Sequence, residues 1–210
     1  MNSSLCSLLG IQYPIMQGAF QWLATPELAA AVSNAGGLGT ISASLYQTKE
    51  ELTEAIARAK SLTDKPFCVN ISMFPEVVEG EKTWDFIAAC CQSQVPVVEL
   101  SGRDPKPFVE ELHGAGAKII HKSTAVRFAQ KAEAAGVDVV SVVGFECGGA
   151  PGNDDVTSMV LIPSVASAVH IPVIGGGGVC DGRSYLAMRA LGAEGVVIGT
   201  RFMATQECAI

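Results

Sequence analysis

The feature that most constrains the fold is a repeat of short apolar segments along the chain. Eight segments rich in valine, isoleucine and other branched apolar residues recur with a spacing of about 26 residues, close to one strand-plus-helix unit of a (β/α)8 barrel. They are residues 15–18, 38–42, 67–71, 95–100, 118–122, 139–144, 173–176 and 195–199. Runs this apolar are typical of parallel strands that are buried on both faces.

Helical patterns with start and stop signals fill the gaps between these segments. Thr25-Pro26 places a cap residue before a proline at the first helical position, and Thr48 and Glu51 have capping-box spacing. Helical patterns also cover 124–135 and 182–191. Four helices are predicted to end in a glycine turn, at Gly36, Gly116, Gly136 and Gly192. This alternation predicts parallel strands joined by right-handed crossovers.

The main alternative is a doubly wound sheet. That fold usually carries its glycine fingerprint after the first strand. Here the first strand ends in Gln17-Gly18-Ala19-Phe20, and the densest glycine run follows the seventh strand instead. The sequence therefore favours a TIM (β/α)8 barrel, with residues 1–210 as a single domain.

The length of 210 residues is short for such a barrel, which typically needs about 250. The eighth strand ends near residue 199, so we expect the last helix and a C-terminal substrate-covering segment to be missing. Without that helix, we expect an exposed apolar patch along the first and last strands.

Composition excludes several classes of function. The net charge of −7 gives no electrostatic footprint for nucleic acid or for an anionic membrane. The N-terminus lacks the basic and apolar regions of a secretory signal, so we expect a cytoplasmic protein. The seven cysteines form no C-x-x-C motif, so neither a metal site nor a disulfide framework is indicated.

Candidate site residues follow the strands, because function gathers at the carboxyl ends of barrel strands. The glycines at 175–178 and the pair Gly199-Thr200 follow the seventh and eighth strands. Backbone N–H groups can approach a phosphate where side chains are absent, so this pattern predicts a phosphate site. The alternative explanation is tight packing of a turn.

Lys122 ends a strand that should be largely buried, so its ammonium needs an anionic or electron-rich partner. That partner is a flavin ring, a phosphate, or the carboxylate of Glu99 or Glu146. His121 alternates with Lys122 and should point to the opposite side, and we expect Lys122 to face the barrel mouth. No base is identifiable beside Cys147, which we interpret as a small core residue.

At these positions the sequence resembles the nitronate monooxygenase (2-nitropropane dioxygenase-like) family of FMN-dependent barrels. That family also includes flavin enoyl-ACP reductases and NAD(P)H:quinone reductases. The matching motifs occur in order over nearly the whole chain: 14–18, 34–39, 69–70, 121–123, 144–149, 176–178 and 199–202. The stretch 144–155 most resembles the quinone reductase branch.

The resemblance implies bound FMN. The residues implied in binding FMN are Ala19, Phe20, Gln21, Asn70, Lys122, Gly149, Gly176, Gly177, Gly178, Gly199 and Thr200. The phosphate would lie on Gly177, Gly178, Gly199 and Thr200. The catalytic residue is unknown, because Ala150 occupies the position of the family's histidine and can neither accept a proton nor donate a hydrogen bond.

The expected function is therefore an FMN-dependent oxidation of alkyl nitronates with O2. Two alternatives stay open: an NAD(P)H:quinone reductase, and a catalytically impaired flavin-binding remnant. Ala150 should impair deprotonation of neutral nitroalkanes most, whereas a preformed nitronate anion needs no base. The expected partners are small molecules, and homo-oligomerisation stays open.

Overall fold

The computed structural model describes residues 4–73, 80–149 and 152–209. These residues form eight parallel strands: β1 (Ile15–Gln17), β2 (Gly39–Ser42), β3 (Phe67–Ser72), β4 (Val97–Ser101), β5 (Lys118–Ser123), β6 (Val139–Val143), β7 (Val173–Gly176) and β8 (Gly195–Ile198). All eight strands predicted from the repeat are confirmed, and they pair in the order β1-β8-β7-β6-β5-β4-β3-β2.

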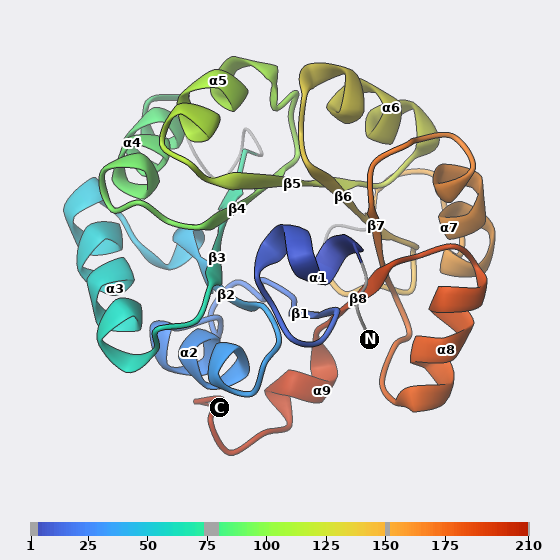
Figure 1. Cartoon of the computed structure of the whole chain (residues 1–210), viewed down its shortest axis with the longest axis horizontal. Coiled ribbons are helices and arrows are strands. Elements are labelled where there is room, and N and C mark those ends of the chain that lie inside the picture. Colours follow the sequence, from blue (N-terminus) through green and yellow to red (C-terminus); the bar gives the residue numbers. More distant parts are fainter. Residues whose placement is uncertain (1–3, 74–79, 150–151, 210) are drawn as a thin grey trace.

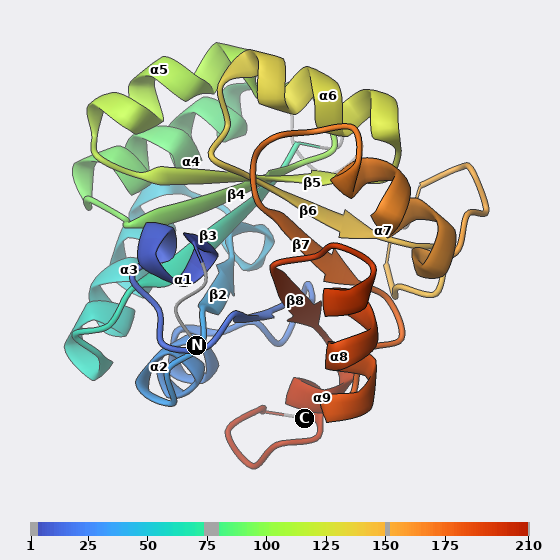
Figure 2. The same cartoon turned by 45° about the vertical axis from the view of Figure 1, so that its right-hand side comes forward.

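The helices surround this sheet as an outer ring (Figure 1). They are α2 (Pro26–Asn34), α3 (Lys49–Leu62), α4 (Gly80–Gln92), α5 (Lys106–Gly114), α6 (Val126–Ala135), α7 (Ser158–Ala166), α8 (Gly182–Ala190) and α9 (Thr200–Met203), with a short 3-10 helix at Ala43–Leu45 after β2. Helices α4, α5 and α6 lie over β4 and β5 on one side of the barrel (Figure 2). The predicted TIM (β/α)8 barrel is therefore confirmed.

The barrel closes between β1 and β2 through few backbone contacts. Met16 and Leu38 form an isolated parallel bridge there. The side chain of Gln17 makes the next pair of hydrogen bonds between the two strands. Its Nε2 donates to the carbonyl of Thr40 at 2.9 Å, and its Oε1 accepts from the Thr40 N–H at 3.1 Å. The buried Gln17 amide thus acts in place of a peptide group.

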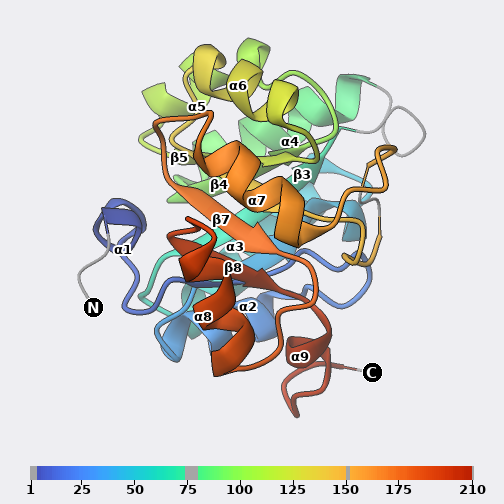
Figure 3. The same cartoon turned by 90° about the vertical axis from the view of Figure 1, so that its right-hand side faces the viewer.

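Helix α1 (Ser4–Leu9) precedes the first strand and covers one end of the barrel (Figure 3). Leu5 and Leu9 pack into the inner core cluster with strand residues such as Met16, Val97 and Ile120. The strand arrows of β7 and β8 point away from α1 in Figure 3, so the carboxyl ends of the strands open at the opposite end. A second and larger apolar cluster fills the space between the strands and the helices.

The predicted helix caps are confirmed, although the capping box expected from Thr48 and Glu51 is only half formed. Thr25 caps α2 by accepting from the Leu28 N–H, and Thr48 caps α3 by accepting from the Glu51 N–H. The Glu51 carboxylate accepts from the Gln47 N–H and not from the Thr48 N–H, as a capping box would require. The four glycines expected to end helices all have positive φ, between 84° and 100°.

The expected exposed patch on the first and last strands is wrong. Every residue of β1 and β8 is buried or half-buried. The chain after β8 forms the one-turn helix α9, which lies in the ring between α8 and α2 (Figure 1). Phe202, Met203 and Cys208 of this segment pack against Leu28 and Val32 of α2 and shield that flank. No helix among the described residues is long and apolar enough to span a membrane.

Candidate functional site

Five polar side chains line the inside of the barrel toward the carboxyl ends of the strands. They are Thr40, Asn70, Glu99, Lys122 and Ser141, one from each of β2 to β6. Each lies two residues after a member of the inner apolar cluster, as Glu99 does after Val97. Because side chains two apart on a strand share a face, these five residues form a polar layer above the apolar interior.

Glu99 is the central charge of this layer and is fully buried. Its Oε2 accepts a hydrogen bond of 2.6 Å from Asn70 Nδ2 and lies 3.4 Å from Lys122 Nζ. The inward orientation expected for Lys122 is confirmed, and Glu99 is the carboxylate that faces it. The Lys122 side chain keeps 21% of its surface exposed, so its ammonium remains accessible from the mouth.

Three oxygens of the polar layer have no hydrogen-bond partner among the described residues: Thr40 Oγ1, Glu99 Oε1 and Ser141 Oγ. Buried polar atoms are nearly always paired with protein, water or ligand. Their presence in one layer beneath the mouth marks this layer as the part of the barrel interior that can take further hydrogen bonds.

His121 points away from the polar layer, as its alternation with Lys122 predicts. Its Nδ1 lies 2.9 Å from Ser123 Oγ, and its Nε2 lies 3.0 Å from the carbonyl oxygen of Arg103. Burial lowers the pKa of His121 below its usual 6.5, against the opposing effect of the Arg103 carbonyl. The ring therefore holds the β4–α5 loop against β5 as a neutral group.

Two glycine turns end β7 and β8 at the mouth. Gly177 and Gly178 have φ of 99° and 70°, in the left-handed region that favours glycine. A Cβ on Gly178 would meet nothing within 4 Å, and a Cβ on Gly199 would meet only Phe20 Cδ1 at 4.0 Å. The backbone N–H groups of Gly177, Gly178 and Gly199 donate to no acceptor among the described residues.

Not every glycine of the run has this freedom. A Cβ on Gly175 would lie 2.9 Å from Ile162, and one on Gly176 would lie 2.4 Å from Val197. Tight packing therefore explains these two glycines, as the alternative explanation held. Gly177 is tightly packed as well, because a Cβ there would lie 2.3 Å from Ser158 Oγ, so space for a side chain begins only at Gly178. Gly176 adds a carbonyl that accepts from Ser158 Oγ at 2.7 Å.

The ends of the first and last strands meet at the mouth. The Gly18 N–H donates to the carbonyl of Ile198 at 2.8 Å. This bond extends the pairing of β1 with β8, and Phe20, two residues further on, lies beside Gly199. Ala19 and Phe20 are half-buried, whereas Gln21 and Thr200 are exposed. Of the residues implied in binding FMN, Ala19, Phe20 and Gln21 therefore lie on one side of the mouth, and Asn70 and Lys122 lie on the other.

The β6–α7 loop is fixed to the end of β7 by Glu146 and Ser158. The Glu146 carboxylate accepts from the Ser158 N–H at 3.0 Å, and its Oε2 lies 3.1 Å from the Ser158 hydroxyl oxygen. Gly149, with φ of 88°, is exposed in this loop. Ala150, at the position of the family's histidine, lies outside the described residues.

Cys147 lies in the same loop and packs partly against the inner cluster. Burial raises the pKa of its thiol above the usual 9.0, while Lys122 opposes the shift and Glu99 and Glu146 add to it. A thiol held neutral is a poor nucleophile, which agrees with a packing role.

A cleft of about 370 Å³ opens beside the mouth, and we call it the rim cleft. Its lining combines the β4–α5 loop, the start of α6 and the end of the β6–α7 loop, with Lys122 among the lining residues. The residues that give it chemical character are Arg103, Asp104, Arg127, Phe128, Lys131 and Asp154. Sequence reasoning missed this cleft, because its charges come from two loops and a helix that only the fold brings together.

Sequence reasoning also gave no role to Ser158. Its signal was weak, because a serine that follows a threonine at the start of a helix is ordinarily only a cap.

His113 and His170 lie away from the mouth and contact Asp138 and Glu133 respectively, as surface residues do. Among the described residues, no group of three or more histidine, cysteine or acidic side chains could hold a metal ion.

The sequence of this chain is similar to those of several known proteins. Over 210 residues the chain is 39% identical to a (3aS,4S,5R,7aS)-5-hydroxy-7a-methyl-1-oxo-octahydro-1H-indene-4-carboxyl-CoA dehydrogenase from Rhodococcus jostii, covering 100% of this chain and 57% of that protein. It is 33% identical to a probable nitronate monooxygenase from Staphylococcus saprophyticus, covering 99% of this chain and 69% of that one. The chain thus spans little more than half the length of the first relative.

Among solved structures, FabK from Thermotoga maritima superposes with a TM-score of 0.93 at 40% identity, covering 100% of this chain and 65% of that one. The sequence profile of the nitronate monooxygenase family matches residues 2–210. With the family pattern extending over the described barrel and its mouth, this chain belongs to the nitronate monooxygenase family of oxidoreductases.

Proposed function

We propose that the chain is an FMN-dependent oxidoreductase that oxidises alkyl nitronates with O2. The observation that carries the proposal is the pair of open glycine turns. Gly177, Gly178 and Gly199 present backbone N–H groups that nothing among the described residues accepts. N–H groups of this kind bind phosphate without side-chain charge, and loops after strands seven and eight are the usual phosphate site of a barrel.

The residues across the mouth fit the polar edge of a flavin ring. Asn70 and Lys122 present donor groups held in place by Glu99, and the unpaired oxygens of the polar layer lie beneath them. Ala19, Phe20, Gln21 and Gly149 would contribute apolar and backbone contact around the ring, with Thr200 and Gly176 completing the phosphate turn. Bound FMN would supply the redox chemistry.

The chain's own contribution is then binding and orientation. Lys122 would hold an anionic substrate or ring oxygen at the mouth, with its position fixed by the buried carboxylate of Glu99. Ala150, at the position of the family's histidine, offers no proton acceptor, so the chain suits a substrate that arrives already as an anion. A nitronate is such an anion, whereas a neutral nitroalkane must first lose a proton.

The second candidate is NAD(P)H:quinone reduction, which the sequence 144–155 favours by its resemblance to that branch. Anaerobic mixing of the FMN-loaded protein with ethylnitronate or with NADH distinguishes the two. Bleaching of the flavin bands by nitronate supports the first candidate, and bleaching by NADH alone supports the second. A protein that stays colourless after incubation with FMN contradicts both.

The phosphate turn is tested by Gly199→Ala, with Gly182→Ala as the matched control. Both positions have room for a methyl group within this chain, but only Gly199 lies in the proposed turn. A methyl group there should occupy the space of the phosphate and weaken FMN binding by tenfold or more, an order-of-magnitude estimate for a lost charge-assisted contact. Equal FMN affinity in the two variants would contradict the proposed phosphate position.

A further inference from the structure

The side chain of Ser158 joins three segments of the chain next to the proposed phosphate turn. Ser158 is the first residue of α7 and is buried, with 2% of its surface exposed. Its Oγ donates to the carbonyl of Gly176 at the end of β7, at 2.7 Å, and accepts from the N–H of Gly144 just after β6, at 3.2 Å. One hydroxyl therefore ties the ends of two neighbouring strands to the start of the helix that connects them.

Glu146 holds Ser158 from the β6–α7 loop. Its two carboxylate oxygens lie 3.1 and 3.0 Å from the Ser158 nitrogen, so the carboxylate accepts the first N–H of α7. The N-cap residue Thr157 makes no side-chain hydrogen bond to the helix. Glu146 therefore supplies the cap that Thr157 does not, and its negative charge is favoured at this end of the helix dipole.

Two glycines pack directly against this pair of side chains. A Cβ on Gly177 would lie 2.3 Å from Ser158 Oγ and 3.4 Å from Glu146 Oε2. A Cβ on Gly144 would lie 2.2 Å from the Ser158 nitrogen and 2.4 Å from Glu146 Oε2. Contacts this short exclude any side chain at either position. The conformation of Gly177, with its φ of 99°, therefore depends on where Ser158 and Glu146 lie.

We propose that Glu146, acting through Ser158, is a positioning residue that holds the Gly177–Gly178 turn in the conformation that binds the FMN phosphate. The contacts run from the carboxylate to the Ser158 N–H, and from the Ser158 hydroxyl to the carbonyl one residue before Gly177. A turn that is already held in place loses less conformational freedom when the phosphate binds, so binding is tighter. The inference rests on the proposed function for the identity of the anion, whereas the contacts belong to the chain itself.

The charge of Glu146 has an effect of the opposite sign. A carboxylate near a phosphate repels it, so removal of the charge alone should tighten FMN binding. Removal of the positioning contact should weaken it. Glu146→Gln separates the two effects, because the amide oxygen can still accept the Ser158 N–H and the amide nitrogen can donate to Ser158 Oγ, without a charge.

The test is fluorescence titration of FMN and of riboflavin with the unaltered chain and its variants. Glu146→Ala and Ser158→Ala should each weaken FMN binding by about tenfold, the scale of one lost charge-assisted hydrogen bond. Riboflavin has no phosphate, so its affinity should change by less than about twofold in the same variants. Glu146→Gln should keep the FMN affinity to within about threefold of the unaltered chain. General damage to the fold would instead weaken both flavins alike.

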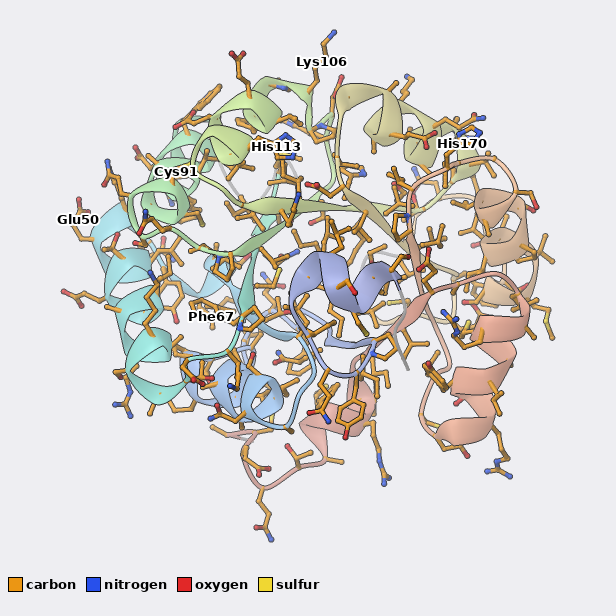
Figure 4. All side chains as sticks on the ribbon, viewed as in Figure 1. Glu50, Phe67, Cys91, Lys106, His113 and His170 are labelled. Atoms are coloured by element: carbon orange, nitrogen blue, oxygen red, sulfur yellow. The ribbon has the colours of Figure 1, made fainter. Side chains whose placement is uncertain are left out.

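Glu50→Ala and Ser164→Ala are the matched controls. Glu50 is an exposed acidic residue in the first turn of α3, and it points outward from the rim of the molecule (Figure 4). Ser164 is exposed on α7, and its hydroxyl donates to the carbonyl of Val160 within the same helix. Both variants should bind FMN and riboflavin as the unaltered chain does.

The outcomes separate this inference from the proposed function. FMN affinity that is unchanged or higher in Glu146→Ala, a loss shared equally by riboflavin, or an equal loss in Glu146→Gln overturns the positioning role. In each of these cases, FMN binding by the unaltered chain still supports the proposed function.

Should the unaltered chain bind no FMN, the proposed function fails and the positioning role is tested on the chain without flavin. The Ser158 amide hydrogen should then exchange about tenfold faster in Glu146→Ala than in Glu50→Ala. The NMR amide signals of Gly177 and Gly178 should shift in Glu146→Ala and return in Glu146→Gln. Exchange rates and signals that are the same in all of these variants overturn the positioning role.

Discussion

Glu99 is the buried charge at the centre of the polar layer inside the barrel mouth. It has no exposed surface, yet its carboxylate is approached by the Asn70 amide and the Lys122 ammonium. Removing one partner of a buried pair leaves an uncompensated charge or donor, which costs more than the pair itself contributes. The three side chains should therefore behave as one unit.

A double-mutant cycle measures this coupling. Glu99→Gln and Lys122→Met should each lower the free energy of unfolding by about 2 kcal/mol, because each leaves the other group without its partner. The double variant should cost clearly less than the sum of the two, since it leaves no unpaired charge. Urea unfolding of the four proteins gives the coupling, and strictly additive costs would show that the pair contributes nothing.

His121 gives stability a pH dependence. Its pKa is lowered by burial, so the unfolded chain takes up a proton near the usual 6.5 while the folded chain does so only at lower pH. Stability should therefore be complete above pH 6.5 and should fall as the pH decreases toward the folded pKa. The free energy of unfolding, measured from about pH 7.5 to 5, should fall less in His121→Asn. The same slope in both proteins would contradict a buried neutral ring.

Some of these residue roles could be read from the sequence. Strand alternation correctly predicted that Lys122 points inward and His121 outward, and Glu99 was among the partners considered for Lys122. The rim cleft could not be predicted in this way. Arg103 lies on the β4–α5 loop and Phe128 on helix α6, and no local pattern indicates that these two segments share a cleft.

At the scale of elements, the closure of the barrel rests on a side chain. Gln17 pairs with both backbone groups of Thr40, where β1 and β2 have only an isolated bridge. The repeat predicted both strands, but no sequence pattern indicated that an amide side chain makes the hydrogen bonds between them. The predicted patch on β1 and β8 was wrong for a related reason, since apolar residues after β8 fold back onto α2.

Replacing that amide tests its role. Gln17→Met keeps the length of the side chain but leaves the Thr40 N–H and carbonyl without partners. Each unpaired buried group costs about 1 to 3 kcal/mol, so the free energy of unfolding should fall by at least about 2 kcal/mol. Gln130→Met is the control, because Gln130 is exposed on α6. Denaturation midpoints that coincide for the two variants would show that β1 and β2 close without the amide.

For the whole molecule, the two sides of the mouth differ in chemistry. Open backbone N–H groups lie after β7 and β8, and cationic side chains lie over β4, β5 and α6. The net charge of −7 gives no long-range attraction for anions, so binding must depend on these local groups. A ligand that bridges both sides would connect elements from the two halves of the barrel.

Binding FMN should therefore stabilise the entire barrel. A ligand that binds only the folded state adds about 2.7 kcal/mol when its concentration is 100 times its Kd, so Tm should rise with FMN concentration. Riboflavin has the same ring without the phosphate and should raise Tm less at equal concentration if the open turns bind phosphate. In Gly199→Ala the advantage of FMN over riboflavin should shrink, whereas Gly182→Ala should keep it. Thermal unfolding by circular dichroism measures all of these shifts, and equal stabilisation by FMN and riboflavin would place the phosphate outside the turns at Gly177 and Gly199.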